Sequence, residues 1–170
     1  MILEKYLTDN KTIVTSLAQF VIFLSVTMVA PLIHNQLITG SIVNAILFVA
    51  TATLGLVGAS LICLVPSLFA LISGTLPAPL ASLIPFIMLS NIILVLSFNY
   101  FKKTNFWLGI FSASLLKFLF LIIILSVVVN YFFSGATASL AITMFSWPQL
   151  LTAVSGGLLA YFILKFNKAF

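Results

Sequence analysis

The stretch that decides the fold is FWLGIFSASLLKFLFLIIILSVVVNYFF, residues 106–133. It is almost entirely apolar and exceeds the about 20 residues that a helix needs to cross a bilayer. One basic side chain, Lys117, stands inside it. A charge near the middle of a bilayer costs between about 2.5 and about 17 kcal/mol, depending on how the cost is measured. We therefore expect a transmembrane helix in which Lys117 has either a partner or a function.

The composition of the whole chain agrees with this segment. Of the 170 residues, 63% are hydrophobic and 5% are charged, and the mean hydropathy is +1.34. A soluble domain of this size must cover itself with polar groups and cannot be this apolar. The sequence predicts an all-α integral membrane protein, with a single transmembrane domain over residues 1–170.

Apolar segments divide the chain into predicted helices. The second and third segments are short, so they are interpreted either as two short spans or as a re-entrant pair that does not cross fully. The others are long enough to cross at about 1.5 Å per residue. The six segments are 12–33, 41–57, 60–74, 82–101, 106–133 and 140–164.

The distribution of lysine decides how these segments alternate. Three predicted connections, 34–40, 75–82 and 134–139, contain no lysine. The positive-inside rule places lysine-rich connections in the cytoplasm. The sequence therefore predicts six helices with both termini cytoplasmic. The lysines on the cytoplasmic side would be Lys5, Lys11, Lys102, Lys103, Lys165 and Lys168.

Prolines and small residues give local detail. Pro66 and Pro85 fall inside predicted helices, which is tolerated where protein or water satisfies the freed carbonyls. Gly156 and Gly157 give the last helix a small face that favours close helix packing.

Several functional classes are excluded by the residues that are missing. The acidic residues are Glu4 and Asp9, both in the predicted cytoplasmic tail, and the chain has one histidine and one cysteine, Cys63. Catalysis by carboxylates requires more acidic residues than these two, and a disulfide or a cysteine metal site requires more than one cysteine. We expect no enzymatic activity, no metal and no cofactor. The formal charge of +5 comes from lysines scattered beside apolar ends, so we expect membrane lipid and not nucleic acid as a partner.

Lys117 and Asn91 are predicted to lie at similar depth. Depth is counted along the helix axis, at about 1.5 Å per residue, from the predicted cytoplasmic ends of two consecutive helices. Lys117 lies about 15 Å from Trp107 by this count, and Asn91 lies about 16 Å from Lys102. A hydrogen bond from Lys117 to the Asn91 carbonyl is therefore expected. It is either a structural bond between helices or the floor of a binding cavity, and burial could also leave the lysine neutral.

Polar residues are denser toward the predicted outer face. Hydrogen-bonding groups beside an aromatic surface are typical of a pocket for a small, partly polar molecule. The alternative is ordinary solvation of loops at the membrane interface. The predicted substrate-binding residues are His34, Asn35, Gln36, Asn44, Asn91, Lys117, Trp147 and Gln149.

The chain resembles a family of transport proteins. Six short helices, cytoplasmic ends and a polar outward cavity, together with PLIHNQLITGSIVNAILFVATATLGLVGA (31–59) and PSLFALISGTLPAPLASLIPFIMLSN (66–91), are similar to the substrate-binding S components of energy-coupling factor (ECF) transporters. The resemblance implies capture of a vitamin or another micronutrient at the plasma membrane of a prokaryote. It also implies a transmembrane coupling subunit and two cytoplasmic ATPases as partners, and the chain itself has no GxxxxGK[ST] nucleotide-binding motif.

Members of that family often dock through an alanine-x-x-x-alanine motif on the first helix. This chain departs from it, and the residues that could form a docking face are Thr15, Ala18 and Ser25. Two other interpretations stay open: a structural scaffold of a cell-envelope complex, similar to shape-determining proteins, which predicts no cavity, and a small channel, which requires a continuous polar path.

Overall fold

Every regular element among residues 2–167 of this computed structural model is a helix. The structure describes residues 2–167, without the side chains of residues 2–11, 130 and 132. Predictions about the side chains of Glu4, Lys5, Asp9 and Lys11, and about Lys168, therefore lie outside the described residues. The elements are α1 (Ile2–Val29), η1 (Ala30–Ile33), α2 (Gln36–Thr53), α3 (Gly55–Ile62), α4 (Val65–Ile72), η2 (Ala78–Leu83), α5 (Ile84–Phe101), α6 (Phe106–Phe132), α7 (Gly135–Phe145) and α8 (Trp147–Phe166).

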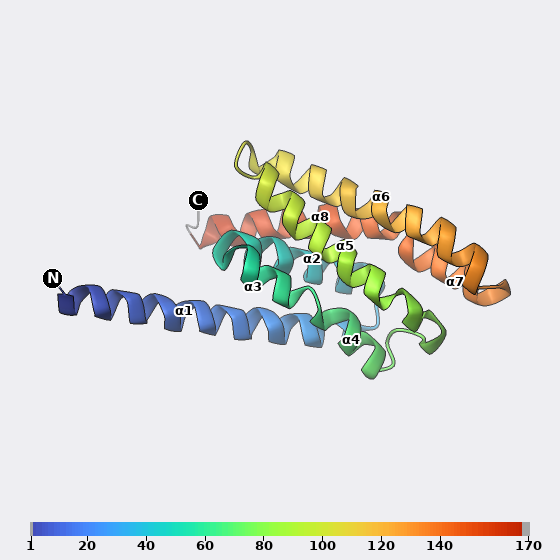
Figure 1. Cartoon of the computed structure of the whole chain (residues 1–170), viewed down its shortest axis with the longest axis horizontal. Helices are drawn as coiled ribbons and strands as arrows, with labels where there is room; N and C mark the ends of the chain where they lie inside the picture. The colour runs from blue at the N-terminus through green and yellow to red at the C-terminus, as the bar shows by residue number, and fades with distance from the viewer. Residues whose placement is uncertain (1, 168–170) are drawn as a thin grey trace.

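Six stretches of the described chain are helical, long and apolar enough to cross a membrane, as the sequence predicted. The start of α1 and the end of α8 lie at the same end of the bundle, together with the turns that follow α2 and α5 (Figure 1). Lys102, Lys103 and Lys165 belong to this end, because they follow α5 or lie in the last turn of α8. We call it the lysine end. The six stretches are Thr12–Ile33, Gln36–Thr53, Gly55–Ile72, Ala78–Phe101, Phe106–Val129 and Gly135–Phe166.

Two of these stretches are broken helices. The third consists of α3 and α4, with a break at residues 63–64, and the sixth consists of α7 and α8, with a break at Ser146. Pro66 and Pro148 each occupy the first turn of the helix that follows. A proline cannot donate a backbone hydrogen bond, and its ring clashes with the carbonyl four residues earlier, so a helix restarts at it.

Pro66 and Pro85 mark discontinuities, as predicted, but each lies in the first turn of a helix and not in its interior. Pro66 begins α4, and Pro85 begins α5 after the 3-10 turn of η2. The single helix predicted over 60–74 is replaced by the pair α3 and α4.

Two predicted connections are shorter than expected, and one turn lies earlier in the chain than predicted. Residues 36–40 belong to α2 because Asn35 caps it, accepting hydrogen bonds from the backbone N–H groups of Leu37 and Ile38 at 3.1 and 3.2 Å. Residues 135–139 belong to α7, and the helix predicted to end at residue 57 ends at Thr53. There the chain turns through Gly55, whose φ of +76° is readily adopted only by glycine.

Helix α8 packs tightly against α2 and α6 through its small face. A Cβ atom added at Gly156 would lie 2.7 Å from the Cβ of Asn44 and 2.8 Å from the carbonyl oxygen of Ser41. A Cβ atom at Gly157 would collide with Ile110. The predicted packing role of this face is confirmed. It holds the first turns of α2 close to α8, where the polar residues of the site lie.

Apolar side chains form two clusters along the bundle. The first includes Phe48, Leu94 and Phe98, joins α2, α3, α5, α6 and α8, and reaches toward the lysine end. The second includes Leu80 and Phe145 and joins η2, α5, α6 and α7 at the opposite end. At the lysine end, Lys102 Nζ donates to the Thr51 carbonyl at 2.8 Å, which satisfies a group in the last turn of α2.

Candidate functional site

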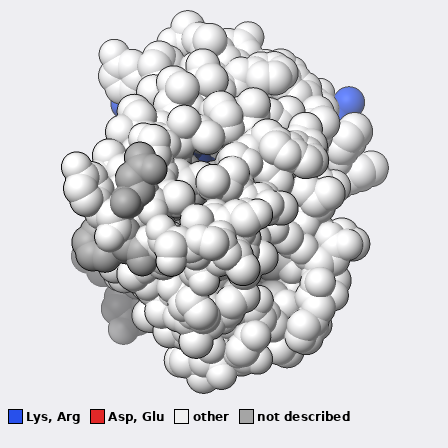
Figure 2. Space-filling view, turned by 90° about the vertical axis from the view of Figure 1, so that its right-hand side faces the viewer, with Lys and Arg blue, Asp and Glu red and all other residues white. Residues whose placement is uncertain are grey.

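A cavity of about 260 Å³ opens among η1, α2, α4, α5, α7 and α8, away from the lysine end. Seven of the eight predicted substrate-binding residues line it. Figure 2 views the molecule from this side: the described surface is white except for blue at its upper edges and a spot of blue between white atoms near its upper centre. The seven residues are His34, Asn35, Gln36, Asn44, Asn91, Lys117 and Gln149.

Trp147, the eighth predicted residue, does not line the cavity. Its side chain is 58% exposed on the outer surface of α8. The prediction placed it beside Gln149 because the two are neighbours in sequence. The helix start at Trp147 directs the two side chains differently, and only Gln149 reaches the cavity.

Lys117 lies at the deep end of the cavity. Its side chain is 3% exposed, and Nζ donates hydrogen bonds of 2.7 Å to Asn91 Oδ1 and 2.7 Å to Asn44 Oδ1. The hydrogen bond to Asn91 on α5 was predicted from depth alone and is confirmed. The hydrogen bond to Asn44 on α2 was not predicted.

Asn44 extends this contact to a fourth helix. Its amide nitrogen Nδ2 donates to Thr152 Oγ1 on α8 at 3.3 Å, while its oxygen accepts from Lys117. Thr152 Oγ1 in turn donates to the carbonyl oxygen of Gln149 at 3.2 Å. An asparagine amide offers both an acceptor and donors, so it can join a cation to a hydroxyl. The polar network therefore connects α5, α6, α2 and α8.

No carboxylate faces this lysine among the side chains that the structure describes. The two acidic residues of the chain, Glu4 and Asp9, belong to the first turns of α1, which begins at the lysine end. Only neutral amide oxygens therefore accept from the Lys117 amine in the described part of the chain. A buried ammonium usually requires an opposite charge or several good acceptors.

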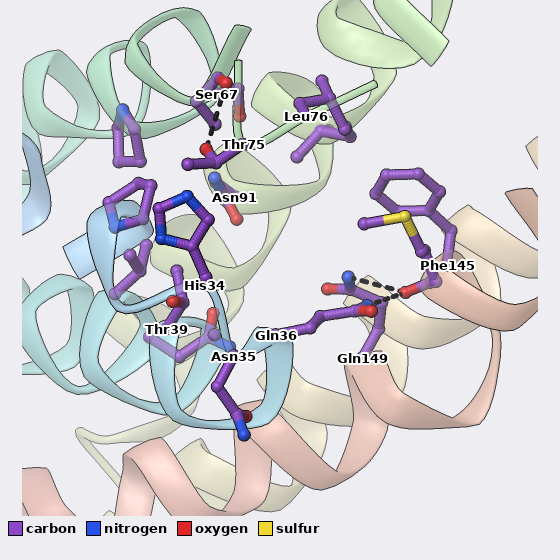
Figure 3. Close-up of a pocket in the computed structure, with 18 of the residues that line it drawn as sticks. His34, Asn35, Gln36, Thr39, Ser67, Thr75, Leu76, Asn91, Phe145 and Gln149 are labelled. Carbon is purple, nitrogen blue, oxygen red and sulfur yellow. Dashed lines mark hydrogen bonds between the residues drawn. The ribbon is translucent and has the colours of Figure 1, made fainter. Parts of the chain in front are cut away.

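Two glutamine side chains meet near the outer part of the cavity. Gln36 and Gln149 both donate from Nε2 to the carbonyl oxygen of Met144, the latter at 3.3 Å. Figure 3 shows them side by side, opposite His34 and Asn91. Met144 lies in the last turn of α7, whose carbonyls have no intrahelical partner. The pair thus joins the start of α2 to the break between α7 and α8.

His34 and Asn35 form the turn between η1 and α2. His34 has a φ of 55°, and its Nδ1 lies 2.7 Å from the Leu32 carbonyl oxygen. The Asn35 side chain caps α2, as described above. Of the predicted residues in this turn, Asn35 therefore has a structural role, and His34 forms part of the cavity wall.

The cavity includes residues that the sequence analysis did not single out. Thr39 and Val43 follow Gln36 at helical spacing on α2, and this periodicity could have revealed them. Ser67 lies in the first turn of α4 and Thr75 in the turn after that helix, and no pattern in the sequence marks them. Apolar side chains such as Ile87 and Phe145 complete the wall.

Toward the lysine end, the region beyond Lys117 is filled by apolar side chains. Leu94, Val95 and Phe98 on α5 follow Asn91 and are fully buried, and Phe48 packs on Phe98 with ring centroids 4.8 Å apart. Ser114, one turn before Lys117, is the one buried side chain in the described part of the chain whose polar atom has no partner. The cavity therefore ends at Lys117, and mostly apolar side chains close the bundle beyond it.

The predicted docking residues lie on α1, outside the cavity. Thr15, Ala18 and Ser25 are exposed, and Ser25 Oγ donates to the carbonyl oxygen of Val21 at 2.8 Å. Comparison of the chain with protein-family models, with curated proteins and with solved structures finds no match.

Proposed function

We propose that this chain is the substrate-capturing membrane subunit of an ATP-driven importer of the ECF type, and that it binds a vitamin or another micronutrient in the cavity above Lys117. The observation that carries the proposal is a cavity of about 260 Å³ with a buried lysine at its deep end. Ligand sites combine apolar walls with a few convergent polar groups. Gln36, Thr39 and Asn44 supply such groups here.

The location of the cavity also supports capture from outside the cell. The cavity opens away from Lys102, Lys103 and Lys165. By the positive-inside rule the lysine end faces the cytoplasm. In this orientation both termini are cytoplasmic, the chain is a multi-pass protein of a prokaryotic plasma membrane, and the cavity faces outward.

The competing interpretations fit the cavity less well. A scaffold of a cell-envelope complex predicts a closed bundle, whereas the described residues enclose space for a small molecule. A channel requires a polar path through the whole bundle. Buried Phe48, Leu94 and Phe98 occupy the region between Lys117 and the lysine end.

Transport in this proposal depends on partner chains. The sequence has no nucleotide-binding motif of the GxxxxGK[ST] type. The energy would come from two cytoplasmic ATPases, transmitted by a transmembrane coupling subunit. The exposed residues Thr15, Ala18 and Ser25 on α1 are the proposed contact with that subunit.

Native mass spectrometry of the protein purified from its own host in mild detergent tests this proposal. We expect a bound small molecule, a co-purifying coupling subunit with ATPases, or both. The control is a Gly156→Leu variant, in which the added side chain collides with Asn44 and disturbs the cavity wall. This variant should retain less of the small molecule than the wild-type chain. A wild-type chain that carries no small molecule and is accompanied by no coupling subunit or ATPase, or only by envelope proteins, would favour the scaffold.

A further inference from the structure

In its protonated form, Lys117 brings a positive charge into the cavity that the surrounding side chains do not balance. Its two hydrogen-bonded partners are the neutral amides of Asn44 and Asn91. The chain contains no arginine, and its two acids lie before residue 10. In the described part of the chain, the charge at the deep end of the cavity is therefore that of one lysine.

The two hydrogen bonds of Nζ leave one donor of the protonated lysine for a further acceptor. An ammonium group has three N–H donors. Asn44 Oδ1 and Asn91 Oδ1, both 2.7 Å from Nζ, account for two of them. Lys117 and both asparagines line the cavity. A ligand that reaches the deep end therefore meets an ammonium group already oriented by two fixed acceptors.

An anionic ligand gains more from this arrangement than a neutral one. Folding has already removed Lys117 from water, so the cost of desolvating the cation is not incurred again on binding. A carboxylate must lose only its own hydration, and it forms a charge-assisted hydrogen bond in a medium of low dielectric constant. A neutral ligand leaves the cation without a counter-charge.

The size and the walls of the cavity limit the ligand further. Its volume of about 260 Å³ lies just below the about 300–1,000 Å³ that ligand pockets usually have, which favours a small molecule. A phosphate carries more charge than one lysine balances, and the forked donors of arginine are absent. Val43, Ile87 and Phe145 give the wall an apolar surface.

We propose that the molecule bound in this cavity is a small organic monocarboxylate, with its carboxylate at Lys117 and its apolar body against Val43, Ile87 and Phe145. This inference rests on the proposed function, because it names the chemical class of the captured substrate. It also predicts the orientation of binding: the carboxylate enters first, and the apolar part ends near Gln36 and Gln149.

The test compares acids with their own amides. Hexanoate, benzoate and phenylacetate, and the corresponding primary amides, are titrated by isothermal calorimetry into the full-length protein in nanodiscs at pH 7. Any small molecule retained by the host-purified protein is also identified by mass. We expect each acid that binds to do so at least about tenfold more tightly than its amide, since hydrogen bonds to charged groups exceed neutral ones. We also expect the retained molecule to carry one carboxyl group.

Two variants assign this preference to Lys117. Lys117→Met removes the charge, and Asn91→Asp supplies an internal carboxylate of the same shape that neutralises the lysine. Both are expected to abolish the preference for acids. The matched controls are Lys103→Met and Asn99→Asp, the same substitutions in the last turn of α5 or just after it, and both should retain it. Asn91→Asp keeps the test decisive if Lys117→Met fails to fold.

The possible outcomes separate the two proposals. Equal binding of acids and amides, an unchanged preference in Asn91→Asp, or a retained molecule without an acid group would overturn the inference and leave substrate capture intact. If no probe binds and no small molecule is retained, substrate capture itself is wrong and the inference is wrong with it.

Discussion

The oxygen of Asn44 and the ammonium of Lys117 lie 2.7 Å apart, although 73 positions separate them in the chain. Asn44 comes from the third turn of α2, and Lys117 from the middle of α6. The same asparagine donates to Thr152 on α8. One amide thus determines how three helices meet at the deep end of the cavity.

Replacing Asn44 with leucine should therefore destabilise the bundle by about 1–3 kcal/mol, because it removes an acceptor from a buried charged group. The measurement is thermal unfolding in detergent. In a Lys117→Met background the same change should cost much less, since the donor that needs the acceptor is gone. Equal costs in the two backgrounds would contradict a direct interaction between the two residues.

Gly156→Ala should cost about 1–3 kcal/mol of stability, because the added methyl group overpacks a close helix contact. The new Cβ would lie 2.8 Å from the backbone nitrogen of Ala45 and 2.8 Å from the Ser41 carbonyl oxygen, which cannot rotate away. Thermal unfolding measures the effect. The control is Leu159→Ala on the exposed face of the same helix, and a larger loss there than at Gly156 would contradict the packing argument.

Gln36 and Gln149 should show strong coupling in a double-mutant cycle. Either glutamine alone still satisfies the Met144 carbonyl oxygen, so Gln36→Leu or Gln149→Leu should each cost less than about 1 kcal/mol. The double variant leaves that carbonyl without either side-chain partner, and should cost more than the sum of the single changes. Hydrogen exchange around the break at Ser146 should rise in the double variant, and additive losses would show that the two residues act separately.

The orientation in the membrane is tested by cysteine labelling. Ser134→Cys and Thr104→Cys, both at exposed positions, are made in a Cys63→Ala background, because Cys63 is the one native cysteine. A membrane-impermeant maleimide added to intact cells should label position 134 and not position 104. Label at position 104 and none at position 134 would place the lysine end outside and invert the proposed topology.

The sequence predicts the number of spanning helices well, because that number depends on composition. Long apolar runs and lysine-free connections are properties of the chain that need no knowledge of packing. The segment 106–133 matches α6 within one residue. The depth of a residue along its helix also follows from the sequence alone, because it depends only on the number of residues from the helix end. This depth was sufficient to pair Lys117 with Asn91.

Helix ends and lateral contacts were harder to predict because they depend on neighbouring elements. Asn35 was interpreted as a ligand contact, although as a residue preceding a helix it is also a natural N-cap. The pairing of Asn44 with Lys117 requires the rotation of α2, which is set by the fit of Gly156 against it. Hydrophobic periodicity defines this rotation poorly when apolar residues surround a helix on every side.

The breaks at residues 63–64 and at Ser146 have a mechanical consequence. Both lie beside the cavity, since Pro66 and Ser67 follow the first, while Met144 and Gln149 flank the second. A continuous helix is stiff along its whole length, whereas two short helices in series can change their relative angle at the break between them. We therefore expect any opening or closing of the cavity entrance to change the angles of α4 and α7, while α3 and α8 remain packed in the apolar cluster around Phe48.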